Sequence, residues 1–223
     1  MMNHVPVRAA ARATWFAAGL AAALVVAGCG SAPSDAPDRE QVAPATGEIL
    51  IGSAPPGWME AGGLNQGRLR IAEFANPATL TPDLVDTARF ESQATLPLPD
   101  PIEFVLGASA EFASRCQGFE DHPVFAGYEN GYPTAVRLMF CRRHGDPSRG
   151  EVRMLKAIQG KEQFYIVSRS RVTAPLEPDV IPLDATEMAI WSEWFGDISL
   201  CDTRLPAHPC PAAVATGGAQ APE

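Results

Sequence analysis

The chain has 223 residues, of which 19% are charged, and its formal net charge at pH 7 is −9. An acidic chain without a run of Lys or Arg repels phosphate backbones and anionic lipid surfaces, which argues against nucleic-acid binding. The length suits one domain with tails.

The first 28 residues have the pattern of an export signal. His4, Arg8 and Arg12 occur there without any acidic group, and an uncharged apolar run follows from Trp15 to Gly28. These are the charged and apolar regions of a signal peptide. The run spans about fourteen residues, whereas a helix needs about twenty to cross a bilayer. A cleavable signal is therefore favoured over a permanent span, with an ordinary secretory signal or a transit peptide as alternatives.

The apolar run ends in Val26-Ala27-Gly28-Cys29, which resembles the lipobox of bacterial lipoproteins. The resemblance implies cleavage before Cys29, diacylglycerol on its thiol and acylation of the new amino group. Two or more acyl chains anchor a protein stably to a membrane. Gly30 is not the aspartate that resembles an inner-membrane retention signal, so we expect a lipid-anchored protein of the cell envelope, on the periplasmic face of the outer membrane.

Cleavage would leave a more acidic domain with an even number of cysteines. Removing residues 1–28 takes away two of the 17 basic residues and none of the 26 acidic ones, which leaves 26 against 15 and a net charge of −11. In an oxidising compartment the four remaining cysteines favour two disulfides. Three connectivities are open, of which we favour Cys116 with Cys141 and Cys201 with Cys210.

Residues 29–46 are rich in proline and small residues and contain no aromatic residue. Such a composition predicts a lipidated, flexible tether. The folded domain is expected over residues 47–210, and residues 211–223 are expected to be a disordered tail. The first strands of the domain are predicted at 48–51 and 69–74, with a turn around Pro55-Pro56-Gly57-Trp58 between them.

A helix is predicted from Pro101 to Arg115, because apolar residues recur there at helical spacing. Its expected buried stripe consists of Ile102, Val105, Leu106, Phe112 and Ala113. A second helix is predicted to begin at Asp184, with Glu187 completing a capping box. Its expected buried stripe consists of Met188, Trp191, Trp194, Phe195 and Ile198.

Between these helices, residues 122–172 predict a four-stranded antiparallel meander. Asn130-Gly131 is its strongest turn signal, because both central residues of a type I′ turn need positive φ. Residues 135–140 alternate in a way typical of a half-buried strand, with Val136, Leu138 and Phe140 on the core face. The order of elements predicts an α+β domain of two layers, in which the antiparallel sheet packs against two helices.

Over residues 48–200 this order of elements resembles the Mog1/PsbP-type module, which also ends in an antiparallel sheet and a helix and can begin with a Pro-Gly-Trp-like segment. The resemblance rests on the order of elements and on no specific motif. Modules of this type are mainly binding or assembly factors, so the resemblance implies no catalytic residue.

The sequence contains no recognised catalytic or phosphate-binding motif. His122, His144 and His208 follow turn-like segments, and Asp121 and His122 would point to opposite faces of an extended strand. Zinc binding by Cys141 with His144 and by His208 with Cys210 is an alternative to the two disulfides, and the oxidising compartment favours the disulfides. No metal and no cofactor are expected.

Aromatic and polar turn residues are dense between positions 118 and 133, and loops of this chemistry often bind partners. The candidate partner-binding residues are Phe119, His122, Tyr128, Asn130 and Tyr132. The alternative is that these aromatic residues cover the open end of the sheet. Lys156 lies among apolar residues, where it would reach the sheet edge or pair with a carboxylate. Only burial with a lowered pKa would make Lys156 functional.

Three functions remain open. The leading hypothesis is a non-enzymatic, membrane-anchored envelope lipoprotein that binds an envelope protein or assists envelope assembly. The alternatives are a carrier of a small ligand or lipid, with a pocket between sheet and helices, and an envelope hydrolase with an unrecognised site. An exposed aromatic patch would favour the partner-binding protein, and a nucleophile beside a base would favour the hydrolase.

Overall fold

The computed structural model describes residues 47–81, 84–144, 149–177, 180 and 182–215. The predicted signal peptide, the predicted lipidation site Cys29 and the predicted tether lie outside these ranges, as do residues 216–223 of the predicted tail. Within the region predicted as a tail, residues 212–215 form a short helix, α3 (Ala212–Ala215). Within the described ranges no helix is long and apolar enough to cross a membrane.

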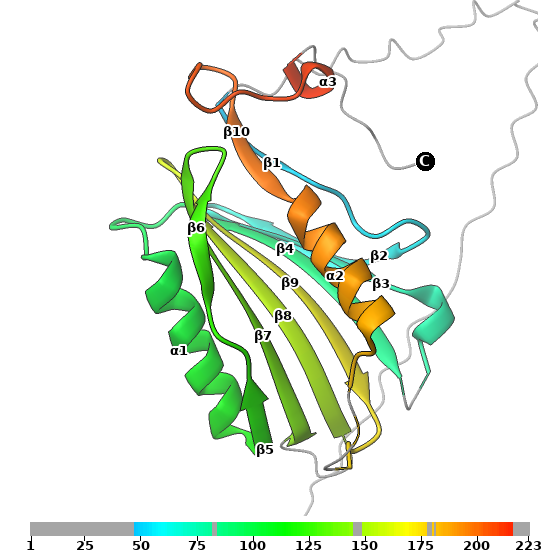
Figure 1. The fold of residues 1–223 in the computed structure, drawn as a ribbon. Helices are drawn as coiled ribbons and strands as arrows, with labels where there is room; N and C mark the ends of the chain where they lie inside the picture. Colours follow the sequence, from blue (N-terminus) through cyan, green and yellow to red (C-terminus); the bar gives the residue numbers. More distant parts are fainter. Residues whose placement is uncertain (1–46, 82–83, 145–148, 178–179, 181, 216–223) are drawn as a thin grey trace, which may run out of the picture. The chain divides into compact units, whose positions relative to one another are not determined.

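The centre of the fold is an antiparallel sheet in the order β2-β3-β4-β9-β8-β7-β5, with β6 paired to β7 (Figure 1). β7 has β8 on one side and both β5 and β6 on the other, so β5 and β6 together form one edge of the sheet. The strands are β2 (Met59–Gln66), β3 (Leu69–Ala75), β4 (Val85–Gln93), β5 (Cys116–Asp121), β6 (Phe125–Glu129), β7 (Tyr132–His144), β8 (Arg149–Gln159) and β9 (Phe164–Thr173).

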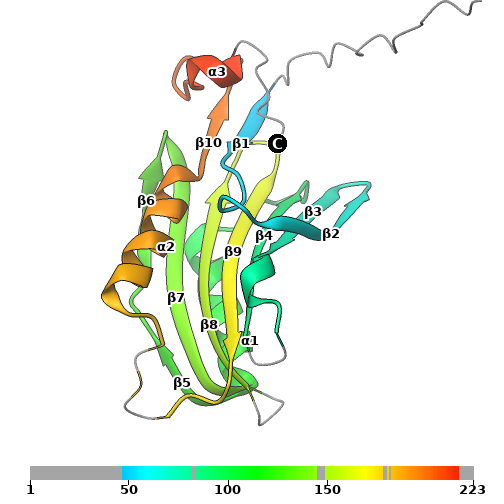
Figure 2. The same ribbon diagram turned by 90° about the vertical axis from the view of Figure 1, so that its right-hand side faces the viewer.

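A separate two-stranded ribbon joins the two ends of the described chain. β1 (Glu48–Ile51) pairs antiparallel with β10 (Ser199–Asp202), and Figure 2 shows the ribbon beside α3 at one end of the sheet. Leu50 and Leu200 pack there with buried residues of the main sheet, among them Tyr165. A 3₁₀ turn, η1 (Pro77–Thr79), precedes β4.

The predicted α+β class and the meander, β6 to β9, are confirmed, but the domain has three layers rather than two. Helix α1 (Pro101–Ser114) and helix α2 (Ala185–Asp197) cover opposite faces of the sheet. Met139 of β7 packs with Phe112 of α1, whereas its neighbour Leu138 packs with Trp191 of α2. Successive side chains of a strand point to opposite faces, and here both faces are covered. β7 is therefore buried on both sides, not half-buried as its alternation indicated.

The sequence signals predicted both helices correctly, but the predicted buried stripe of α1 is wrong in part. The predicted capping box of α2 is present, with the carboxylate of Asp184 accepting the N–H of Glu187. α1 begins after Asp100, whose side chain accepts two backbone N–H groups of the first turn. Ile102 and Leu106 of α1 are exposed at 41% and 42%. They were expected on the buried stripe, which α1 fills instead with smaller residues beside Val105 and Phe112.

The turn between β6 and β7 is the predicted type I′ turn. Asn130 has φ 46° and Gly131 has φ 81°. A Cβ atom at Gly131 would lie 2.8 Å from the ring of His208, so glycine is needed there for space as well as for conformation. The ring of His208 packs on Tyr132 with 4.3 Å between the centroids. The turn is thereby held against the segment that follows β10.

The structure joins Cys116 to Cys141 and Cys201 to Cys210, which is the pairing that we favoured from the sequence. The first disulfide links the start of β5 to β7 beneath α1, and the second closes the loop after β10. All four cysteines of the domain are thus oxidised. None is available as the thiolate that a zinc site requires.

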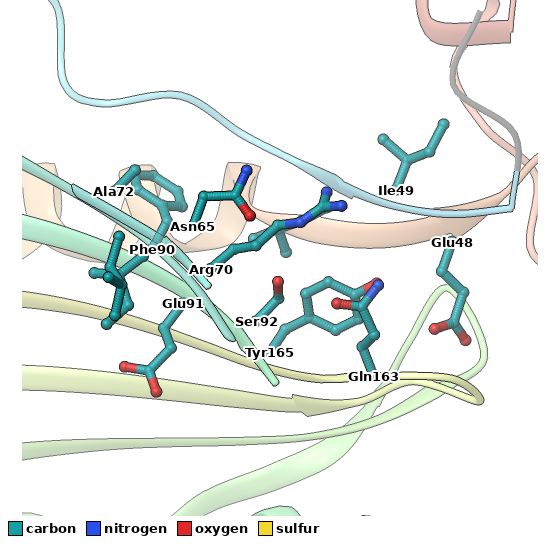
Figure 3. Close-up of a pocket in the computed structure, with 13 residues that line it drawn as sticks. Glu48, Ile49, Asn65, Arg70, Ala72, Phe90, Glu91, Ser92, Gln163 and Tyr165 are labelled. Atoms are coloured by element: carbon teal, nitrogen blue, oxygen red, sulfur yellow. The ribbon is translucent and has the colours of Figure 1, made fainter. Parts of the chain in front are cut away.

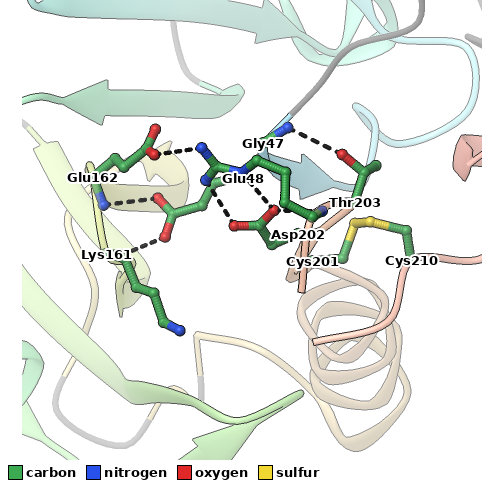
Figure 4. A network of polar contacts seen from close by, with 9 residues as sticks. Gly47, Glu48, Lys161, Glu162, Cys201, Asp202, Thr203 and Cys210 are labelled. Carbon is green, nitrogen blue, oxygen red and sulfur yellow. Dashed lines mark hydrogen bonds and ion pairs between the residues drawn. A yellow bond between two sulfur atoms is a disulfide. The ribbon is translucent and has the colours of Figure 1, made fainter. Parts of the chain in front are cut away.

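Polar contacts fix the loop after β10 to the turn between β8 and β9 (Figure 4). The carboxylate of Glu48 accepts the backbone N–H groups of Lys161 and Glu162. Arg204 donates to Asp202 at 2.8 Å and to Glu162 at 2.7 Å. The hydrogen bonds from Arg204 lower the pKa of Asp202 to about 2, so this carboxylate is ionised at neutral pH.

Candidate functional site

A groove of about 460 Å³ lies between α2 and the main sheet. We call it the α2 groove. It opens at the sheet edge formed by β5 and β6. Its lining residues are His122, Phe125, Glu129, Val136, Leu138, Met154, Lys156, Met188, Ser192, Phe195 and Gly196.

The α2 groove is apolar because two neighbouring strands present the same face to it. Val136 and Leu138 of β7 lie beside Lys156 and Met154 of β8 in the ladder, so their side chains share the face that α2 covers. A stretch of that face between α2 and the sheet edge stays uncovered. A recess of this size and composition suits one or a few apolar side chains or a small apolar molecule.

Phe125 is the most conspicuous residue at the mouth of the groove. Its side chain is 68% exposed although it is aromatic, and it lies opposite Val136 in the β6–β7 ladder. Cross-strand neighbours project to the same face, which places Phe125 on the groove side of the edge. Tyr128 of β6 is 78% exposed and projects to the other face. The edge strand therefore presents an exposed aromatic ring on each side.

β6 also has main-chain groups that its neighbour does not use. In a hairpin with a two-residue turn, the pair that closes the turn is hydrogen-bonded and the pairs alternate from there. Glu129 and Tyr132 close this turn, so Tyr128 and Ala126 occupy positions that are not hydrogen-bonded to β7. Pro133, which has no N–H, lies opposite Tyr128 as this pattern requires. The N–H and C=O groups of Ala126 and Tyr128 point outward.

In most edge strands, charged residues or proline prevent pairing with a further strand. From Phe125 to Tyr128 the strand is Phe-Ala-Gly-Tyr, with no charge and no proline, and all four residues are exposed. An uncharged, exposed edge can accept another strand, with main-chain hydrogen bonds supplying affinity and side-chain pockets supplying specificity. The α2 groove is such a pocket.

Lys156 lines the groove and is 1% exposed. Its ammonium group donates to the carbonyl oxygens of Phe195 at 2.8 Å and Ile198 at 2.5 Å, and to the carboxylate of Glu129 at 2.5 Å. Burial lowers the pKa of Lys156, against the opposing effect of Glu129. All three N–H donors are engaged, and the two carbonyls belong to the C-terminal end of α2, which carries partial negative charge. Lys156 therefore ties α2 and β6 to the sheet.

A second buried cation lies on the same face of the sheet. Arg169 of β9 is 6% exposed and lies over the rings of Trp58, Trp191 and Trp194 at 4.9, 4.6 and 5.9 Å. Desolvation lowers the pKa of Arg169 to about 10. Cation–π contacts of this kind stabilise a desolvated guanidinium. Because Trp58 precedes β2, the cluster holds the β1–β2 connection against α2.

The five predicted partner-binding residues are not brought together. Tyr128 and His122 are exposed, and His122 lines the α2 groove. Asn130 donates to the carbonyls of Leu200 and Pro209. Tyr132 is buried at 1% exposure, and Phe119 is half-buried and packs against Phe112 on the α1 side.

Sequence reasoning missed Phe125, Met154 and Met188 as lining residues. The signal that could have found Phe125 is its place in the hairpin. Counting back from the Asn-Gly turn puts it opposite Val136, on the face of the alternating apolar residues. Met188 was expected in the core of α2 and is only half-buried. No local signal shows that a side of α2 faces an open recess, because this depends on how far the helix lies from the sheet edge.

Few side chains of the groove are ionisable. Its ionisable side chains are His122, Glu129 and Lys156, and the ammonium of Lys156 is fully hydrogen-bonded. Ser192 lies on α2, and no hydrogen bond in the described part of the chain joins its hydroxyl to a base. Among the described residues no group of three or more His, Cys, Asp or Glu side chains could hold a metal ion.

No model of a known protein family matches the sequence, and no curated protein matches it. Solved structures similar to this chain include a Pseudomonas aeruginosa protein of unknown function, with a TM-score of 0.42 and 15% identity over 74% of this chain and 99% of the other. They also include the Ran-binding protein Mog1p of Saccharomyces cerevisiae, with a TM-score of 0.42 and 13% identity over 70% of this chain and 96% of the other.

A third similar structure is LpqN of Mycobacterium tuberculosis, which is described as involved in cell envelope biogenesis. Its TM-score is 0.35 and its identity 11%, over 69% of this chain and 88% of LpqN. Mog1, whose family the order of elements resembles, is thus among the similar structures. The resemblance to the Mog1/PsbP-type module itself stays a prediction.

Proposed function

We propose that the chain is a non-enzymatic, lipid-anchored protein of the cell envelope that binds an extended segment of a partner protein along β6. The observation that carries this proposal is the coincidence of two features at one sheet edge. The outward main-chain groups of Ala126 and Tyr128 are unpaired by β7, and the α2 groove opens directly beside them.

The register of β6 defines the chemistry of the partner segment. A strand added to β6 would alternate its side chains between the two faces of the sheet. Those on the side of Phe125 would lie over the α2 groove, and those on the other side would lie beside Tyr128. The segment should therefore carry an apolar residue that enters the groove, and it should contain no proline where its N–H meets the carbonyls of β6.

The anchor part of the proposal rests on the lipobox-like segment that ends at Cys29. Acyl chains on Cys29 would hold the domain on the periplasmic face of the outer membrane, and residues 30–46 would set its reach. An acidic domain is repelled by anionic headgroups, so its binding surface stays available to proteins rather than to the lipid surface.

Labelling cells with a fatty-acid analogue tests the anchor. The wild-type chain should become labelled, and Cys29→Ala should lose essentially all label, because the acyl acceptor is gone. Total protein is measured by immunoblotting as the control. Equal labelling of both chains would show that the anchor is not at Cys29.

Photo-crosslinking in cells tests the binding surface. A photoreactive residue at Phe125 or at Tyr128 should give a discrete adduct with a partner protein, because both side chains lie on the edge strand. The matched control is Glu103, which is exposed on α1 and should give none. Adducts of equal intensity at all three positions would contradict the proposal, as would an adduct of twice the chain's own mass, which would identify a second copy as the occupant.

A further inference from the structure

Gly127 leaves a gap in the middle of the exposed edge strand β6. Phe125 and Glu129 both line the α2 groove, and Gly127 lies between them on the same face, because alternate residues of a strand share a face. A Cβ atom at Gly127 would have no atom within 4 Å other than those of its chain neighbours. The rim of the groove is therefore open at Gly127, and a side chain from an added strand can enter there.

The register of β6 assigns this gap to one residue of an added strand. Ala126 and Tyr128 carry the outward main-chain groups, so an antiparallel strand would place a pair without hydrogen bonds at Gly127. The Cα atoms of such a pair are only about 4.5 Å apart. An aromatic side chain opposite a glycine of an edge strand covers the exposed backbone. Met154 and Met188 line the groove, and methionine contacts aromatic rings favourably.

The charge that the groove presents beside this gap is negative. Glu129 and Lys156 form an ion pair through Oε2 of Glu129, but Lys156 is 1% exposed whereas the side chain of Glu129 is 38% exposed. Oε1 of Glu129 accepts no hydrogen bond from any residue of the described ranges. The last turn of α2, which ends at Asp197, has no basic residue. A cation on the added strand opposite Glu129 would therefore be attracted and would favour one register.

The opposite edge of the sheet, β2, does not combine these features. A second cavity of about 470 Å³ lies there between β1 and β3, β4 and β9 (Figure 3), and Leu64 of β2 is among its lining residues. However, β2 carries the charged residue Glu60, and its register shifts between Glu60 and Gly62. A charge and a bulge both hinder pairing with a further strand, which favours β6 as the edge that accepts one.

We infer that the partner segment carries a large apolar residue, best an aromatic one, opposite Gly127 and a Lys or Arg two positions away, opposite Glu129. The aromatic side chain enters the α2 groove through the gap, and the cation pairs with the solvent-facing oxygen of Glu129. This register and chemistry rest on the proposed binding of a strand along β6, and they add which residues of that strand are recognised.

Pentapeptides with acetylated and amidated ends test this register by NMR titration, because the edge from Phe125 to Glu129 has five residues. The protein is the chain from residue 30 onward, since every described element lies within residues 47–215. The probe Lys-Thr-Phe-Thr-Lys reads the same in both directions, so it places Phe opposite Gly127 and Lys opposite Glu129 in either strand orientation. It should bind about tenfold more tightly than Lys-Thr-Ala-Thr-Lys, and several-fold more tightly than Glu-Thr-Phe-Thr-Glu.

Gly127→Val tests the gap without removing a main-chain donor. Gly127 does not have a positive φ, and valine favours a strand, so the melting temperature should not fall. The added side chain should erase the preference for Phe over Ala at the centre of the peptide. The matched control is Ala126→Val, on the other face of β6, which should keep that preference.

Glu129→Gln tests the charge. It should remove most of the preference for the peptide with Lys over the one with Glu. Glu103→Gln changes the net charge by the same amount on α1, where Glu103 is exposed, and should leave the preference unchanged. An equal loss in both variants would show that the general acidity of the domain selects the peptide, and would overturn the role of Glu129.

Strand pairing and register can fail separately. Shifts of the Ala126 and Tyr128 amide signals report pairing along β6, whereas the preferences for Phe and Lys report the register. Peptides that shift these signals but bind equally well would overturn the register and leave binding along β6 intact. Shifts centred on Leu64, or no shift with Lys-Thr-Phe-Thr-Lys, would also overturn the register, and the cellular adducts at Phe125 and Tyr128 then decide on β6 by themselves.

Discussion

Lys156→Met should lower the free energy of unfolding by about 3 kcal/mol. Methionine keeps the length of the side chain but donates no hydrogen bond. The carbonyls of Phe195 and Ile198 would lose the buried donor that they share, and Glu129 would lose its ion pair. Replacing a whole buried ion pair by apolar residues can be neutral, but here only one member is replaced and two main-chain acceptors are left without a partner.

The measurement for Lys156 is the midpoint of urea unfolding of the chain from residue 30 onward. Glu129→Gln is the matched control: its amide oxygen can still accept from Lys156, and its side chain is 38% exposed, so it should cost roughly 1 kcal/mol or less. If Lys156→Met unfolds with a free energy equal to or above that of the wild type, then Lys156 does not hold α2 and β6 against the sheet.

Lys156 also shows where sequence reasoning ends. Its place among apolar residues of a strand indicated that it was unusual, but two of its partners lie 39 and 42 positions away. Whether it would reach solvent or be buried depends on where α2 crosses the sheet. By contrast, the capping box of α2 and the Asn130-Gly131 turn were predictable, because the residues that determine them are within three positions of one another.

The strands likewise divide into those that the sequence predicts and those that it does not. The meander was predictable because β7 to β9 are rich in β-branched and apolar residues between strong turn signals. β2 was missed because Met59–Gln66 contains two glycines and is mostly exposed. β4 was missed because its charged residues pair with other charged residues, as Arg89 does with Glu73. Such strands are stabilised by their neighbours in the sheet, which a local pattern does not reveal.

The candidate site was predictable only in part. The dense aromatic segment 118–133 does contain the edge strand, but its aromatic residues differ in exposure. Tyr132 is buried and Phe119 half-buried, whereas Phe125 and Tyr128 are exposed. The strand period assigns faces correctly only once the register of the hairpin is known. The α2 groove itself arises from the separation between a helix and a sheet edge, which is a tertiary feature.

The second large effect is expected from Ala126→Pro, which should abolish the adduct formed from a photoreactive residue at Phe125. The N–H of Ala126 points away from β7, so its loss removes a donor for the added strand but none from the β6–β7 ladder. Pro133 shows that the hairpin tolerates proline at such an outward position. Gly127 occupies an inward, hydrogen-bonded position, and Gly127→Pro should instead lower the melting temperature markedly.

The most direct test of binding along β6 is therefore one comparison of adduct yield and melting temperature among wild type, Ala126→Pro and Ala126→Val. Valine keeps the outward N–H and favours a strand, so Ala126→Val should retain the partner adduct, whereas Ala126→Pro should lose it with a melting temperature within a few degrees of wild type. If Ala126→Pro is folded and still gives the full adduct, the partner does not pair with β6, and the central claim is contradicted.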